Sequence, residues 1–270
     1  MDKNSACGGI FFVLDVFTKC LCMHISIAAE KLFDMWGFPV TNTVLLTLLV
    51  SVILIVFSMV FFKNLSDVPG RFQSAIEAIF EVLWKFILDI AGSQALARKI
   101  FPLIATIFFF VLFSNWTELI PGLGTIGIQH GHAIIPFIRS PSADLNMTMA
   151  LALVAVFSIQ YMGVATIGAV KYAKKFFISP FAKPYGIGMF VGILELLGEA
   201  TKFASFSFRL FGNIFAGEVL LIVIVYLVPY FIPLPFLFLE IFVGLVQASV
   251  FAILTLVFIK MATMEHDTAH

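Results

Sequence analysis

Charge is scarce in this chain: 12% of its 270 residues are charged, whereas 61% are hydrophobic. Soluble domains average about a quarter charged residues and about half apolar ones, so the composition excludes an ordinary soluble fold. The mean hydropathy of +1.08 indicates a membrane protein, with the lipid bilayer as its surroundings. The formal net charge is zero, which argues against a nucleic-acid partner.

The chain also lacks the motifs of most enzymes and metalloproteins. Its three cysteines, Cys7, Cys20 and Cys22, fit no zinc spacing, and we expect them to be small apolar side chains. It has no P-loop, no nucleophile elbow and no cluster of metal ligands, so we expect no cofactor and no nucleotide chemistry. A GxGxxG match at 122–127 follows an apolar run without a βαβ unit, which excludes a dinucleotide site.

Long apolar runs dominate what is present. Residues 40–62 contain no charge and are long enough to cross a bilayer core of about 30 Å. Further spans are predicted at about 100–119 and 144–170, and longer apolar runs follow at 187–228 and 236–263. We therefore predict an all-α integral membrane protein with five membrane-embedded helices.

Residues 71–91 follow a different pattern. Charged side chains recur every few positions there, and apolar side chains fill the gaps. Such a pattern is typical of an amphipathic helix that lies in the membrane interface instead of crossing it. The charged positions are Arg71, Glu77, Glu81, Lys85 and Asp89.

The loops predict an orientation. Residues 171–183 contain several lysines and no acid, whereas Arg139 is the basic residue of the 120–143 loop. By the positive-inside rule the lysine-rich loop lies inside and the 120–143 loop outside. We expect His130 and His132, in that outer loop, to be solvated instead of binding zinc. The lysines are Lys171, Lys174, Lys175 and Lys183.

Three segments follow from this layout: an N-terminal outer or surface segment (1–39), the first three spans (40–186), and a long hairpin with the C-terminal tail (187–270). Single helices over the two hairpin runs would be about 63 Å and about 42 Å long at 1.5 Å per residue. They are too long for an upright crossing. Either a break occurs near Gly198 or Gly212, or the hairpin is strongly tilted, and we expect the tilt.

Five charged residues interrupt the first run of this hairpin. Each costs roughly 2.5–3.5 kcal/mol near the bilayer centre, so we expect them to face a partner or a water-filled path. On a helical wheel, four polar residues lie within about 80° of Arg209, and Glu218 lies on the opposite side. Arg209 has no acid three or four positions away, so its counter-charge is expected on another chain. The four polar residues are Glu195, Glu199, Lys202 and Asn213.

An alternative for part of this set is left open: Glu199 and Lys202 are three positions apart and can neutralise each other. On the last helix, Glu240 and Gln247 share one face, and Glu240 follows the outer turn as Glu218 precedes it. Two neighbouring acids in a low dielectric do not both ionise easily, so one should hold a proton and can relay it.

Polar residues also gather at the outer ends of the earlier spans. Ser142 and Asp144 open a helix there, and helix capping competes with a role as an ion entrance. The entrance candidates are Asn115, Glu118, Asp144 and Asn146.

Several segments together resemble subunit a of the F-type rotary ATP synthases. The most specific is SFRLFGNIFAGEVL at 207–220. The resemblance extends over roughly residues 40–264. The other matching segments, in family order, are PGRFQ at 69–73, SNWTELIP at 114–121, PSADLN at 141–146, ELLGEATK at 195–202 and GLVQA at 244–248.

The resemblance implies a stator subunit that translocates ions and is not catalytic alone. Its partners would be a rotating ring of c subunits, the peripheral stalk subunit b and the other synthase subunits. The location would be a bacterial cytoplasmic membrane or, alternatively, the mitochondrial inner membrane. Arg209 would face a ring carboxylate between two half-channels. The outer half-channel would contain Glu218, Glu240 and Gln247 and would be entered past Glu118 and Asp144. The inner one would contain Glu195, Glu199 and Lys202, and Asn213 would also belong to the ion path.

The chain departs from the family pattern at one point. Many members pair a carboxylate with a histidine where this chain has Glu218 and Glu240, which leaves both protons and sodium open as the coupling ion. Two other functions remain as alternatives: a secondary transporter that binds an anionic substrate at Arg209, or a structural membrane anchor. The sequence shows neither an inverted repeat nor a pair of interrupted helices, which argues against the transporter.

Overall fold

The computed structural model describes residues 31–35, 38–63, 65–120, 127–130, 133–136, 139–176, 187–228 and 232–264. The three cysteines and residues 122–126 of the GxGxxG match lie outside these residues. Five of the described helices are long and apolar enough to cross a membrane, so the predicted all-α membrane architecture is confirmed. These five helices are α2 (Asn42–Lys63), α4 (Gln94–Glu118), α5 (Leu145–Ile167), α7 (Ile187–Leu227) and α8 (Pro233–Thr263).

Two short antiparallel hairpins add to this helical architecture and were not predicted. Strands β1 (Lys31–Met35) and β2 (Phe38–Thr41) pair just before α2. Strands β3 (Gly127–His130) and β4 (Ala133–Pro136) pair within the outer loop, so His130 ends a strand and faces Ala133 in the register. Such local pairing escapes a search for spans because each strand is only four or five residues long.

Helix α3 (Arg71–Ala91) has the bounds predicted for the amphipathic helix; its place in the membrane interface stays a prediction. It ends at Gly92, which adopts a positive φ of 74° and donates its N–H to Leu88. Ser93 then caps α4, because its hydroxyl accepts from the backbone N–H of Leu96. These consecutive caps turn the chain tightly, so α3 packs back against α4 and α8.

The third span is shorter than predicted. It ends at Ile167 instead of about residue 170, because Gly168 has a φ of 94° that interrupts the helix. A separate short helix, α6 (Ala169–Phe176), follows and packs against α5 and α7. A single 3-10 turn, η2 (Pro141–Ala143), precedes α5.

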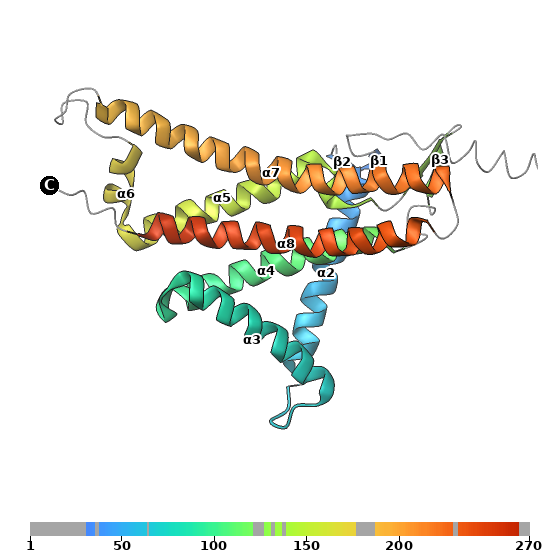
Figure 1. Ribbon diagram of the computed structural model, residues 1–270, viewed down its shortest axis with the longest axis horizontal. Coiled ribbons are helices and arrows are strands. Elements are labelled where there is room, and N and C mark those ends of the chain that lie inside the picture. The colour runs from blue at the N-terminus through green and yellow to red at the C-terminus, as the bar shows by residue number, and fades with distance from the viewer. Residues whose placement is uncertain are drawn as a thin grey trace, which may run out of the picture.

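Helix α7 is continuous through Gly198 and Gly212, so the break considered for it does not occur. With 41 residues it is about 62 Å long, and α8 with 31 residues is about 46 Å long. The two helices lie side by side along the longest axis of the molecule, while α2 runs across their direction (Figure 1). Five helices arranged in this way cannot all stand upright in one bilayer; the tilt of the hairpin itself stays a prediction.

The core lies where α4, α5, α7 and α8 meet. The ring of Phe206 on α7 packs at a tilt of 56° against that of Phe251 on α8, with 4.8 Å between the centroids. Leu210, Leu256 and Ile159 belong to the same buried cluster. The outward faces remain apolar: on α2, for example, Met59 is 68% exposed. An apolar exterior around a packed apolar core is what a protein surrounded by lipid requires.

Two ends of the helix bundle can be distinguished in Figure 1. One carries α6 and the C-terminal end of α8. The opposite one carries β1, β2 and β3, the C-terminal end of α7 and the N-terminal end of α8. By the loop charges, the first is the predicted inner end and the second the predicted outer end.

Candidate functional site

The two carboxylates at the outer end have different surroundings. Glu218 on α7 accepts a hydrogen bond from the guanidinium of Arg139 at 3.2 Å, and the side chains are 23% and 9% exposed. Glu240 on α8 is buried, and its carboxyl group occupies the space beside Gly217, where a side chain would collide with it. The missing side chain at Gly217 therefore lets the Glu240 carboxyl reach the backbone next to Glu218.

Arg209 lies nearer to the N-terminal end of α7 than Glu218 does. Its guanidinium donates to the hydroxyl of Ser205, one turn earlier, at 3.1 Å, and the side chain is exposed. Within the described part of the chain it forms no ion pair. Nearby, the amide of Asn213 donates to Gln247 of α8 at 2.6 Å, which links the two hairpin helices. Arg209 is thus a permanent cation on an exposed face of α7, with no counter-charge among the residues that the structure describes.

A buried hydrogen-bond network joins the outer ends of α2, α4, α5 and α8. Asp144 caps α5 by accepting from the backbone N–H of Asn146, and its other oxygen accepts from Thr43 of α2 at 3.0 Å. Ser142 donates to the side-chain oxygen of Asn115 at 2.7 Å, and the Asn115 amide donates to the carbonyl of Gly244 at 3.3 Å. Helix capping, one of the two roles considered for Asp144, is therefore what the structure shows.

The remaining entrance candidates, Glu118 and Asn146, lie at the same end. Glu118 is the last residue of α4, and nothing is described of its side chain. Asn146 is exposed and contributes only its backbone N–H, to Asp144. Of the four candidates, the structure brings Asn115 and Asp144 into buried contacts.

The inner end holds the second polar cluster. Lys202 forms an ion pair with Glu199 at 2.7 Å and also lies over the ring of Phe258 on α8. This is the local neutralisation that the sequence left open. The second carboxylate oxygen of Glu199 is buried without a hydrogen-bond partner among the described residues. Glu195, one turn earlier on the same helix, is half-buried.

Tyr172 of α6 closes this inner cluster and was not anticipated from the sequence. Its phenol donates to Gln160 of α5, and its ring packs where Gly163 leaves space. Burial, followed by the negative charges of Glu199 and Glu195, raises the pKa of the Tyr172 phenol to about 12. The phenol therefore stays protonated and acts as a neutral hydrogen-bond donor beside the carboxylates.

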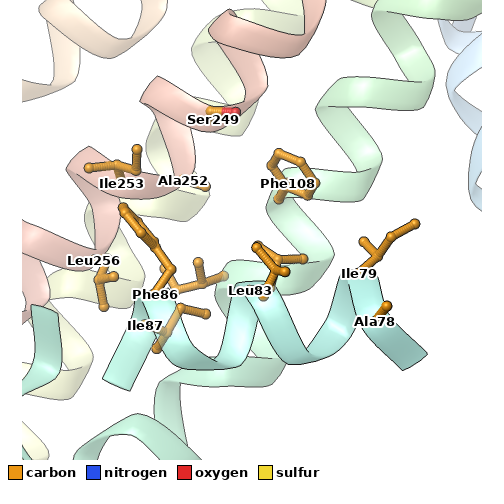
Figure 2. A pocket seen from close by; sticks show the side chains of 12 residues that line it. Ala78, Ile79, Leu83, Phe86, Ile87, Phe108, Ser249, Ala252, Ile253 and Leu256 are labelled. Carbon is orange, nitrogen blue, oxygen red and sulfur yellow. The ribbon is translucent and has the colours of Figure 1, made fainter. Parts of the chain in front are cut away.

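One cavity among the described residues is lined almost entirely by apolar side chains. It measures about 460 Å³ and lies between α3, α4 and α8, where Phe86, Phe108 and Leu256 contribute to its wall (Figure 2). Ser249 is its one polar lining residue, and that hydroxyl already donates to the Leu245 carbonyl at 2.8 Å. No group of three or more metal-binding side chains occurs in the described ranges either. The ion pairs Arg139–Glu218 and Lys202–Glu199 lie away from this cavity and involve residues of α7.

Besides Tyr172, sequence reasoning missed three contributors to these clusters. Arg139 was noted only as a loop charge, Thr43 as part of an apolar span, and Gly217 only as a letter in the family motif. Each acts on a residue that is far away in sequence or on another helix. The position of Arg139 could have indicated this contact. It is the single arginine of the 120–143 loop, and Glu218, for which the sequence predicts no cationic partner, lies at the same end of the bundle.

Comparison with known proteins agrees with this geometry. The family model described as the ATP synthase A chain matches residues 44–260. The chain is 37% identical to the sodium ion specific ATP synthase subunit a of Propionigenium modestum over 86% of this chain and 78% of that protein. It is 34% identical to the ATP synthase subunit a of Gloeobacter violaceus, over 85% and 86%, and to that of Campylobacter jejuni, over 81% and 88%.

The matched region contains all five apolar helices almost completely, and it includes the arginine on the open face of α7 and both polar clusters. The relatives are bacterial, and the helices fit a multi-pass protein of the bacterial inner membrane. Subunit a of this family is a membrane component that translocates ions and is not catalytic by itself. The chain belongs to the ATP synthase subunit a family.

Proposed function

We propose that the chain supplies two offset half-channels to a rotating ring of c subunits, with Arg209 between them. The outer half-channel comprises Glu218, Glu240, Asn213 and Gln247. The inner one comprises Glu195, Glu199 and Lys202. The observation that carries the proposal is the exposed guanidinium of Arg209, which has no ion pair among the described residues and lies between polar clusters at opposite ends of one hairpin.

The ring carboxylate is the counter-charge that Arg209 lacks. The exposed residues of α7 around it include the small residues Ser205, Gly212 and Ala216, where a partner helix can approach closely. An arginine opposite a carboxyl group favours its ionised form, so the ring releases its proton before that carboxylate passes. The fixed charge also repels a proton that would cross directly between the half-channels.

We propose that the hairpin is strongly tilted. Helix α2, with 22 residues, is about 33 Å long and matches a bilayer core of about 30 Å, whereas α7 is nearly twice as long. Since α2 runs across the hairpin direction (Figure 1), placing α2 near the membrane normal makes α7 and α8 oblique. An oblique α7 also offers a longer contact to a ring helix and separates the two clusters laterally.

Protons are the proposed coupling ion, because carboxyl groups and amide hydrogen bonds carry the path and no metal-binding cluster occurs in the described ranges. Sodium is the second candidate, because one relative at 37% identity is sodium ion specific. The stalk subunit b is a further proposed partner, as the resemblance implies for a stator.

The test uses the purified synthase in lipid vesicles, with ATP-driven transport of protons and of sodium measured separately. Arg209→Ala should abolish pumping and raise the passive leak, while the ring still co-purifies. Arg209→Lys should also fail, since an amine deprotonates in such a site and lacks the planar fork. The matched control is Lys85→Ala, which removes an exposed cation on α3. Near-normal pumping by Arg209→Ala would contradict the proposal.

A further inference from the structure

Arg139 is a loop residue whose charged side chain is almost completely buried. It precedes η2, its side chain is 9% exposed, and it reaches α7 to contact the Glu218 carboxylate at 3.2 Å. A guanidinium cannot release its proton at any physiological pH, so this contact places a permanent positive charge against one carboxylate of the outer cluster. Arg139 is not among the residues that the sequence predicts for the ion path.

The same contact makes the two outer carboxyl groups unequal. Glu218 has a charged partner, whereas Glu240 is buried and has no ion pair among the described residues. The Glu240 carboxyl lies against Gly217, the residue next to Glu218, so the two acids belong to one site. When two such acids compete, the one with a cation beside it ionises first and the other retains the proton.

We propose that Arg139 is a positioning residue that holds Glu218 ionised, so that Glu240 is the group that takes up the proton from the outer side. The proton passes from outer water to a Glu240 carboxylate oxygen, and then from the neutral Glu240 to a ring carboxylate. Glu218 keeps its charge throughout. The inference rests on the proposed half-channels and assigns the relay within the outer one.

Other charged groups near this site have separate partners or point elsewhere. Asp144, at the start of α5, is occupied by Thr43 and by its own helix. Arg209 lies on the opposite side of α7 from Glu218 by the helical wheel and contacts Ser205. Within the described part of the chain, Arg139 is therefore the cation that acts on the outer carboxylates.

The test measures ATP synthesis by the whole synthase in vesicles while the pH on the outer side is varied. Arg139→Gln removes a positive charge and should move the half-maximal outer pH upward by about one unit, a tenfold change in proton concentration. Glu218→Gln leaves the positive charge of Arg139 uncompensated beside Glu240 and should move the half-maximal outer pH downward. The double variant removes both charges and should return the midpoint to within about twofold of the wild-type proton concentration.

Three further variants complete the design. Glu240→Gln should lower the synthesis rate at least 100-fold. Arg139→Lys keeps the charge and should shift the midpoint less than Arg139→Gln. Lys85→Gln, on the exposed face of α3, should shift nothing. A purely structural role of Arg139 would lower rates without opposite shifts for the two single variants.

The proposal is overturned if the single variants shift in the same direction, if the double variant fails to restore the midpoint, or if Glu240→Gln still makes ATP. A wild-type complex that transports neither ion would instead overturn the proposed function. If sodium alone supports synthesis, the same variants are compared by the half-saturating sodium concentration. Arg139→Gln should lower that concentration and Glu218→Gln should raise it, because a carboxylate binds either cation.

Discussion

Gly217→Ala tests whether ion transport depends on the observed position of the Glu240 carboxyl group. A methyl group at residue 217 would overlap the carboxyl group of Glu240, well inside the 3.4 Å at which ordinary contacts begin. Because the overlapping atoms are the end of a flexible side chain, we expect the carboxyl group to move instead of the helix. A displacement of about 1 Å at a reacting group costs on the order of 100-fold in rate.

The stability of the subunit should change much less. Overpacking costs about 1–3 kcal/mol, but alanine is a better helix former than glycine by about 1 kcal/mol. These terms largely offset each other, so the complex should assemble. Gly198→Ala is the control for helix propensity, because residue 198 has open space around it on the same helix.

The assay is ATP-driven pumping by the purified complex, normalised to the amount of co-purified ring. Gly217→Ala should lose most of the transport, and Gly217→Ala/Glu240→Asp should regain part of it, because the shorter acid withdraws from the added methyl group. If Gly217→Ala pumps at the wild-type rate in an assembled complex, the Glu240 carboxyl does not need the position seen here, and the reasoning fails.

Three other predictions concern neighbouring parts of the structure. Thr43→Val removes the donor to buried Asp144 and should destabilise the solubilised complex by about 1–3 kcal/mol in thermal unfolding, whereas Thr43→Ser should not. Lys202→Met leaves the Glu199 charge partly buried and unpaired and should cost about 2 kcal/mol in the same assay; no recovery in Lys202→Met/Glu199→Gln would argue against the pair. Ala252→Phe should fill the apolar cavity and keep pumping within twofold of wild type, and a larger loss would place the cavity in the ion path.

The spans and the central arginine could be read from the sequence because both depend on local pattern. A run without charges long enough for a bilayer must form a helix there, since lipid offers no partner for free backbone groups. All five predicted spans agree with the described helices to within about six residues at each end. The third ended early at Gly168, whose positive φ is a backbone property that hydropathy does not register.

The pairings of the candidate residues could not be predicted, because they join distant parts of the chain. Arg139 and Glu218 are 79 residues apart, and Thr43 and Asp144 are 101 apart. Sequence spacing limits neighbours only within one helix, as for Glu199 and Lys202, which were foreseen as a possible pair. Across helices, the rotation and register of packed side chains decide which groups meet.

The sequence by itself therefore determined that this is a helical membrane protein of the subunit a family, with a permanent charge in its last hairpin. Only the tertiary structure decided that α7 is continuous, that Asp144 is a capping residue tied to α2, and that the two outer glutamates have unequal surroundings. The physical reason is that hydropathy and motif act along the chain. The charge state of a buried carboxyl group depends instead on which other side chains the packing brings within a few ångströms of it.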